Sequence, residues 1–164
     1  MKKKLTTVVF KGTEEQEKQL LEVIEKNKGV AGNLLPVLQG AQEIYGYLPI
    51  EVQKIIAKEL DVSMTEIYGV ASFYSQFKLN PDGEIAIAVC LGTACYVKGS
   101  GQIADKVTEL VGVAPGETSP DGKYSFEATR CIGACGLAPV VTVNGDVYGR
   151  LTPADVEGMI KKYQ

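Results

Sequence analysis

The first half of the chain repeats apolar residues three or four positions apart, which is the spacing of one face of a helix. Thr13 with Gln16 and Ser63 with Glu66 have the spacing of capping boxes, which satisfy free amide donors where a helix begins. The pattern predicts a small bundle of four amphipathic helices. Gly69 weakens the fourth, and an extended conformation is an alternative for "SFYSQF". The four segments are 13–29, 33–49, 49–60 and the segment that begins at residue 63.

Each predicted helix has an inner face and start or stop signals. Asn33 is the expected N-cap of the second helix, Pro36 fits its first turn, and Pro49 begins the third. Gly29 is the expected end of the first. The expected inner faces are Leu20, Leu21 and Ile24; Leu34, Leu38, Ala41 and Tyr45; Val52, Ile55, Ile56 and Leu60; and Ile67, Val70 and Ala71.

The second half alternates strand patterns with helical ones. Strands are predicted at 84–90 and 124–130, and "VVTVNGDVYG" predicts two short strands joined at Asn144-Gly145. A helix over 100–112 would bury Ile103, Val107, Leu110 and Val111 and end at Gly112. Thr152 and Pro153 have the N-cap and N1 preferences of a last helix that would bury Val156, Met159 and Ile160, and residues 113–123 are expected to be loop.

This order of elements predicts an α+β or α/β fold with two domains. A helical bundle domain (1–79) is followed by a thioredoxin-like domain with a small mixed sheet (80–164), and the turn sequence "NPDG" lies at their boundary. Both strands at 84–90 and 124–130 lead directly into segments that contain cysteine. We therefore expect the two cysteine segments to lie at the same end of the sheet.

Composition narrows the functional classes. The chain has 164 residues, of which 45% are hydrophobic and 23% charged. Its net charge is -3, so the chain as a whole does not attract nucleic acid or an anionic membrane electrostatically. No apolar run approaches a membrane span, and the apolar segment after "MKKK" is too short for a signal peptide. We expect a cytoplasmic protein. The absence of histidine excludes Ser-His and Cys-His catalysis and histidine metal ligands.

One alternative function in the first half is DNA binding. Residues 54–73 have the rhythm of a helix-turn-helix, whose second helix reads DNA with basic or amide side chains. There is no lysine or arginine from Asp61 to Gln76, and Glu66 would face phosphate. Two packed helices at a corner are the favoured interpretation.

All four cysteines lie in two similar segments, Cys90 and Cys95 in "VCLGTACYVKGSG" and Cys131 and Cys135 in "RCIGACGLAP". Three interpretations remain open. In a 2Fe–2S cluster each iron needs two thiolates, one pair from each segment; a structural zinc would take all four; disulfides or a redox pair are disfavoured by a cytosolic setting and the lack of C-x-x-C. The glycine-rich loops favour the cluster, since backbone amides can approach sulfur there.

The cysteine segments also carry a family resemblance. "CLGTAC" followed by "VKG", together with "CIGACGLAPVVTVNGDVYGRLTP", closely resembles the thioredoxin-like 2Fe–2S small subunit of NADH:quinone oxidoreductase (complex I). "LLPVLQGAQEIYGYLP" and "VSMTEIYGVASFYSQF" resemble that family's helical first half. Relatives also serve NAD-linked hydrogenases, including electron-bifurcating ones, and formate dehydrogenases. Tyr96 departs from the family, in which histidine often follows the second cysteine.

The resemblance implies a specific role. Cys90, Cys95, Cys131 and Cys135 would hold one 2Fe–2S cluster in an electron-transfer subunit that has no complete active site of its own. The implied partners are a larger subunit that binds FMN and NAD(P)H, and a catalytic iron–sulfur subunit of the hydrogenase, formate dehydrogenase or complex I type. Neither nucleic acid nor direct membrane insertion is expected.

Two further features have open interpretations. Arg130, beside Cys131, either stabilises a reduced cluster or docks a partner, or it is an ordinary solvated arginine. Five aromatic residues of the first half are expected to lie mainly in its core, with a docking surface as the alternative: Tyr45, Tyr47, Tyr68, Phe73 and Tyr74.

Overall fold

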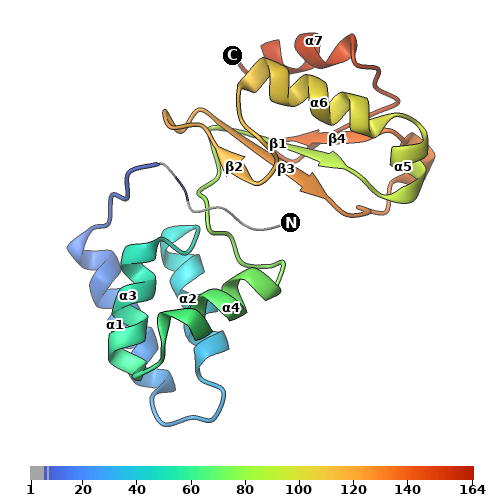
Figure 1. The fold of residues 1–164 in the computed structure, drawn as a ribbon. Helices are drawn as coiled ribbons and strands as arrows, with labels where there is room; N and C mark the ends of the chain where they lie inside the picture. The colour runs from blue at the N-terminus through green and yellow to red at the C-terminus, as the bar shows by residue number, and fades with distance from the viewer. Residues whose placement is uncertain (1–5, 7) are drawn as a thin grey trace. The chain divides into compact units, whose positions relative to one another are not determined.

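The computed structural model describes residue 6 and residues 8–164. The chain separates into two compact units, Met1–Pro81 and Asp82–Gln164, each with its own core. Figure 1 shows the helices of the first unit and a sheet with helices in the second. The predicted combination of a helical bundle and a thioredoxin-like domain with a mixed sheet is confirmed.

The described residues of the first unit form four helices. They are α1 (Glu14–Asn27), α2 (Leu34–Tyr45), α3 (Ile50–Leu60) and α4 (Met64–Phe73). The capping box at Thr13 is complete, since its side chain accepts from the backbone of Gln16 and the Gln16 side chain accepts from the backbone of Thr13. At α4 only half of the predicted box forms: the Ser63 hydroxyl accepts from the Glu66 backbone.

The predicted helices differ from the structure in small details. Asn33 is the N-cap of α2, as predicted, although its dihedrals are already helical and its side chain makes no capping hydrogen bond. Residues 72 and 73 are helical rather than extended. Leu21 is 41% exposed, because the stripe that packs inward on α1 is centred on Leu20 and Ile24.

The core of the first unit joins all four helices with the segment after them. Its fully buried members include Leu20, Leu38, Ile56, Ile67 and Phe77. Phe77 lies beyond α4, so residues 74–79 fold back onto the bundle. The buried Gln53 donates to the Leu48 carbonyl oxygen at 2.7 Å, while its side-chain oxygen has no partner among the described residues.

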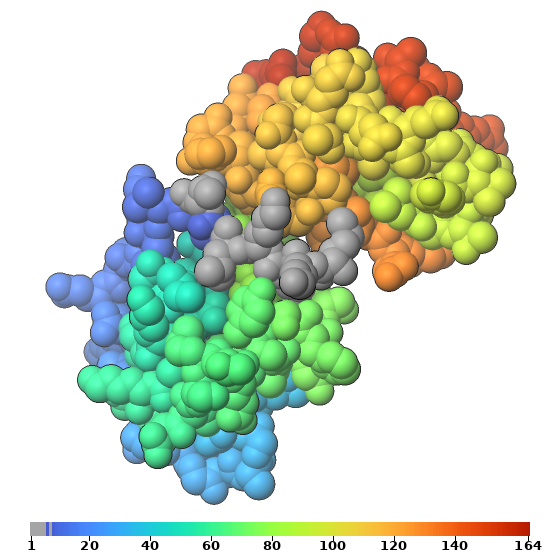
Figure 2. Space-filling view, viewed as in Figure 1, coloured from blue at the N-terminus to red at the C-terminus, as the bar shows by residue number. Residues whose placement is uncertain are grey.

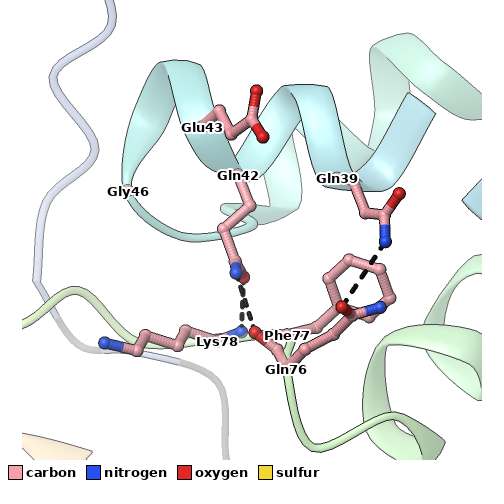
Figure 3. Close-up of a pocket in the computed structure, with 7 residues that line it drawn as sticks. All are labelled: Gln39, Gln42, Glu43, Gly46, Gln76, Phe77 and Lys78. Atoms are coloured by element: carbon pink, nitrogen blue, oxygen red, sulfur yellow. Dashed lines mark hydrogen bonds between the residues drawn. The ribbon is translucent and has the colours of Figure 1, made fainter. Parts of the chain in front are cut away.

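Glutamines of α2 hold this returning segment. The Gln42 side chain donates to the Gln76 carbonyl oxygen at 2.7 Å and accepts from the Lys78 backbone N–H at 2.6 Å. Its amide group thus satisfies the backbone of residues 76–78 as the backbone of a neighbouring strand would. Both bonds are drawn in Figure 3. The residues around them line a hollow of about 470 Å³. Because both ends of the Gln42 amide are occupied by the chain itself, we interpret these contacts as structural. The hollow is lined by Gln39, Gln42, Glu43, Gly46, Gln76, Phe77 and Lys78.

The second unit is built on a five-stranded sheet in the order β2-β3-β1-β4-β5. Strands β1 and β3 are parallel, and the other neighbouring pairs are antiparallel. The strands are β1 (Ile85–Cys90), β2 (Glu117–Thr118), β3 (Tyr124–Thr129), β4 (Val140–Val143) and β5 (Asp146–Gly149). The helices are α5 (Thr93–Val97), α6 (Ser100–Val111), the 3-10 turn η1 (Cys135–Leu137) and α7 (Asp155–Lys161).

Helices α6 and α7 cover one face of this sheet (Figure 1). Alternate residues of β1, at 85, 87 and 89, are buried beneath them, as the period-two geometry of a strand requires. The β4–β5 turn is Asn144-Gly145, with positive φ at both residues. The Asn144 side chain also accepts from the Ala86 backbone and donates to the Glu84 carbonyl oxygen. The turn therefore fixes the start of β1.

Four details of the second unit were not predicted correctly. The first cysteine segment contains a helix, α5, and the expected loop contains the two-residue strand β2. Leu110 is 38% exposed at the edge of the α6 stripe. The last helix begins at Asp155, after a turn in which the Thr152 hydroxyl and backbone N–H both donate to the Asp155 carboxylate.

Candidate iron–sulfur site

The parallel pairing of β1 and β3 brings the two cysteine segments together. Cys90, the last residue of β1, is in register with Thr129, the last of β3, and Leu91 donates to the Thr129 carbonyl oxygen at 2.9 Å. A Cβ placed on Gly92 would lie 3.0 Å from Cys131 Cβ, so the segments touch backbone to side chain. The expectation that both segments lie at one end of the sheet is confirmed.

The first segment holds its two sulfurs inside the domain. Cys90 and Cys95 are each 2% exposed, Cys90 at the end of a strand and Cys95 within α5. Burial raises the pKa of Cys90, but the backbone N–H groups of Gly92 and Ile132 and the neighbouring Cys95 outweigh it, so the net pKa is lowered. Burial and the adjacent Cys90 raise the pKa of Cys95, against the lowering effect of the Val140 backbone.

The second segment holds its sulfurs at the surface. Cys131 and Cys135 are exposed, and their sulfurs are 3.6 Å apart. The nearby Cys131 thiol, by hydrogen bonding and by its charge, raises the pKa of Cys135. The segment is tied to the end of β5, because Arg150 donates its backbone N–H to the Leu137 carbonyl oxygen at 2.7 Å.

The two pairs are close enough to influence each other. Cys90 and Cys95 belong to one small buried cluster with Ala138 and Val140, which follow Cys135. The Cys90 sulfur lies 3.6 Å from the Arg130 carbonyl oxygen, and charge on Cys135 contributes to the raised pKa of Cys95. The structure thus arranges the sulfurs as two neighbouring pairs. Within residue 6 and residues 8–164, no group of three or more His, Cys, Asp or Glu side chains is gathered around a single metal position.

This arrangement fits a group with two metal ions that each take two thiolates. Two thiolates on one tetrahedral ion with metal–sulfur bonds of about 2.3 Å lie about 3.8 Å apart, close to the spacing found for Cys131 and Cys135. Backbone N–H groups of Gly92, Ile132 and Val140 act on the sulfurs and stabilise negative charge there. Gly92 also leaves the space between the segments that a side chain would fill.

Comparison with protein families shows to which family this chain belongs. Residues 20–164 match the family model for thioredoxin-like [2Fe-2S] ferredoxins. The chain belongs to this family. The resemblance recognised in the cysteine segments is confirmed.

Relatives of this ferredoxin-family chain are subunits of larger enzymes. It is 40% identical over 146 residues to the NADP-reducing hydrogenase subunit HndA of Solidesulfovibrio fructosivorans, covering 89% of this chain and 85% of the relative. It is 30% identical over 154 residues to an NADH-quinone oxidoreductase subunit of Aquifex aeolicus, covering 94% and 96%. With NADH-quinone oxidoreductase subunit 2 of Thermus thermophilus it shares 34% identity over 134 residues, or 81% and 74% of the two chains.

Solved structures support the fold of this ferredoxin-family member. A chain of an air-oxidised NAD+-reducing [NiFe]-hydrogenase matches with a TM-score of 0.60 and 23% identity over 85% of this chain. The chain corresponds to only 24% of that larger hydrogenase chain. At this identity the likeness bears on the fold alone.

Sequence reasoning missed the contacts that hold the segments in place. Gly92 and Gly149 were not singled out, although a Cβ on Gly149 would lie 2.7 Å from Leu137 Cβ. Their close approaches join parts of the chain far apart in sequence, so no local pattern reveals them. The side chain of Arg130 is exposed, as both of its interpretations allow.

The aromatic residues of the first unit divide in a way that corrects the expectation. Tyr47 is buried and Tyr45 half-buried, but Phe73 is 81% exposed, Tyr74 43% and Tyr68 38%. The core interpretation is therefore wrong for the three residues of α4 and its end, because that helix turns only Ile67 and Ala71 fully inward.

The helix-turn-helix pattern of the sequence corresponds to two packed helices, as predicted in place of a DNA-binding motif. These are α3 and α4, joined by the turn at 61–63, and residues 61–76 contain no lysine or arginine.

Among the described residues, none of the helices has the length and apolarity needed to span a bilayer.

Proposed function

We propose that Cys90, Cys95, Cys131 and Cys135 hold one [2Fe-2S] cluster, and that the chain is an electron-transfer subunit of a flavin- and iron–sulfur-containing NAD(P)H-linked oxidoreductase. The observation that carries the proposal is the arrangement of the four thiols as two neighbouring pairs at one end of a sheet. Each pair supplies the two thiolates that one iron of such a cluster requires beyond its bridging sulfides.

The residues at this site have different roles. When bound, the cluster accepts and releases one electron at a time. Cys90 and Cys95 anchor it from the buried side, where water is excluded, and Cys131 and Cys135 from the surface. The N–H groups of Gly92, Ile132 and Val140 offset the negative charge of the Cys90 and Cys95 thiolates, which favours the more negative reduced state.

The partners follow from the relatives. The relatives compared above are named as subunits of an NADP-reducing hydrogenase and of NADH-quinone oxidoreductases. We infer that this chain relays or stores electrons beside a larger subunit that binds FMN and NAD(P)H, in a cytoplasmic complex whose catalytic iron–sulfur subunit is of the hydrogenase, formate dehydrogenase or complex I type. On this proposal the chain has no complete active site of its own.

The test is anaerobic purification followed by iron and sulfide analysis, a visible spectrum and EPR after dithionite reduction. About two irons and two sulfides per chain, with an EPR signal only after reduction, are expected.

Cys135→Ala should lose the cluster while the helix signal of the first unit persists, and Thr93→Ala, at an exposed position of the other segment, should keep it. One zinc per chain and no sulfide would establish a structural zinc module instead. Salt-dependent DNA binding by the loaded chain would favour a different function, that of an iron–sulfur redox sensor that binds DNA through the helix-turn-helix pattern of residues 54–73.

A further inference from the structure

The two cysteine pairs differ in exposure. Cys90 and Cys95 are each 2% exposed, whereas Cys131 and Cys135 are both exposed. Figure 2 shows the orange segment after β3, which contains the second pair, at the surface of the second unit. The reactivity of a thiol toward an oxidant follows its exposure, so the second pair is the one that a dissolved oxidant reaches.

The second pair is also placed so that its two sulfurs can bond to each other. They lie 3.6 Å apart, and a disulfide bond of about 2.05 Å requires that they approach by about 1.5 Å. The chain turns between them at Gly133, which has a φ of +85°. Nothing lies within 4 Å of the Cβ positions of Gly133 and Gly136, so the backbone has room for this movement.

The first pair lacks this freedom. Cys90 is the last residue of β1, in register with Thr129, and Cys95 lies within α5. Both side chains belong to a buried cluster with Ala138 and Val140. Burial keeps an oxidant away from these two sulfurs, and the strand and the helix hold their backbones in place.

We propose that Cys131 and Cys135 form a reversible disulfide when the chain carries no cluster and meets a peroxide, and that this bond blocks cluster insertion until a dithiol reduces it. The disulfide itself depends on the two thiols alone, while the block on insertion rests on the proposed function. A [2Fe-2S] cluster needs four thiolates, so a disulfide in the second pair leaves one iron without protein ligands. In a reducing compartment such a bond is transient, which is compatible with the use of the same sulfurs as ligands.

The bond forms in two steps. One thiolate attacks a peroxide oxygen, the O–O bond breaks, and the sulfur becomes a sulfenic acid while the first water is released. The other thiolate attacks the sulfenic sulfur, the S–O bond breaks, and the second water is released. Two thiols and one hydrogen peroxide thus give one disulfide and two waters. A dithiol reverses the reaction through a mixed disulfide and is itself oxidised.

The second thiol also protects the first. Without a neighbouring thiol, a sulfenic acid is oxidised further to a sulfinic acid, which a dithiol does not reduce. The proposed disulfide therefore keeps the ligands of the second segment recoverable.

The experiment uses the full-length chain, freed of metal by a chelator in the presence of a dithiol and then transferred anaerobically to thiol-free buffer. About one equivalent of hydrogen peroxide should lower the mass by about 2 Da, for the two hydrogens lost, and a dithiol should restore it. Trypsin releases each cysteine pair in its own peptide, residues 79–98 and residues 131–150. The mass loss should lie in the second peptide.

Cys135→Ser and Cys95→Ser form a matched pair of variants, because each removes one thiol from one pair. In about a tenfold excess of peroxide, Cys135→Ser should gain about 32 Da, as sulfinic acid, which the dithiol does not remove. Cys95→Ser should still lose about 2 Da in the second peptide, as the wild type does. Circular dichroism of both variants must match the wild type, so that altered oxidation is not a loss of folding.

Cluster insertion is measured as transfer of a [2Fe-2S] cluster from a loaded scaffold protein in thiol-free buffer, followed by visible absorbance. The oxidised wild type should accept the cluster at least about tenfold more slowly than the reduced wild type, and a dithiol should restore the rate. Equal rates for the two forms would overturn the proposal.

The peptide masses give two further results that would overturn it. One is a mass loss in the first peptide or in neither peptide. The other is sulfinic acid in the wild type to the same extent as in Cys135→Ser. If the reduced wild type accepted no cluster at all, the proposed function would fail and the block on insertion with it, and the peptide masses would still decide whether the disulfide forms.

Discussion

Replacing Gly92 with alanine tests whether close contact between the two cysteine segments is necessary for the site. The Cβ of the new side chain would lie 3.0 Å from Cys131 Cβ and 3.2 Å from Cys131 Cα. Gly92 has φ -60 and ψ 157, which any residue adopts, so alanine introduces no backbone strain. The substitution therefore isolates one effect, a steric clash between the segments.

The size of the effect follows from the distance that must be regained. Carbon atoms in contact prefer about 3.5–4.0 Å, so the segments must separate by about 0.5–1 Å. Overpacking of this kind costs about 1–3 kcal/mol. For a domain of the second unit's size, each kcal/mol lowers the Tm by about 4–8 °C. We expect a Tm lower by about 10 °C and incomplete cluster loading, because the displaced Cys131 no longer faces its partners.

The assay compares Gly92→Ala with Gly136→Ala. Gly136 lies between Cys135 and Leu137 in the second segment, its φ is not positive, and nothing lies within 4 Å of its Cβ position. Iron and sulfide content and the temperature at which visible absorbance bleaches are measured for both variants. Wild-type values for Gly92→Ala, or equal losses in the two variants, would refute the close-contact argument.

Three further substitutions have expected outcomes. Asn144→Ala removes the acceptor of the Ala86 N–H and a residue suited to positive φ, and should cost about 1–3 kcal/mol in urea denaturation, with Asn144→Asp costing less. Gly149→Ala places a Cβ 2.8 Å from the Leu137 carbonyl oxygen, so it should lower the Tm by more than Gly136→Ala does. Gly69→Ala, inside α4 with nothing within 4 Å, should raise the stability of the first unit by about 0.5–1 kcal/mol in thermal unfolding; a loss there would contradict the free space seen around it.

Periodic patterns predicted the elements well because burial imposes them. The alternation in 84–90 and the helical stripe in 100–112 arise from one face of each element packing on one core, and the structure has β1 and α6 at those places. The position of both cysteine segments at one end of the sheet was predicted from two strands that each lead into a cysteine segment, whereas the parallel pairing of β1 and β3 was seen only in the structure. Short elements were not predicted, since the five residues of α5 and the two of β2 are too few to establish a period.

Contacts between distant residues lay beyond pattern analysis for a different reason. Glycine is compatible with a turn, a positive φ or a close approach, and only the folded chain distinguishes them. Gly112 and Gly145 have positive φ, as their positions after a helix and in a hairpin indicate. Gly92 has dihedrals that any residue adopts, but Cys131 occupies the space that a side chain at this position would need. Its role depends on a residue 39 positions later in the sequence.

Charge shows the same distinction between a sum and a location. A net charge of -3 suggests a chain that repels acidic partners, yet an approaching protein responds mainly to charges within a Debye length, about 8 Å at physiological salt. Lys98 and Arg130 lie in the cysteine segments, and Asp105 and Asp146 follow them closely in the sequence, so both signs of charge occur there. The sum over the chain therefore does not predict which sign of charge a partner meets beside the exposed thiols of Cys131 and Cys135.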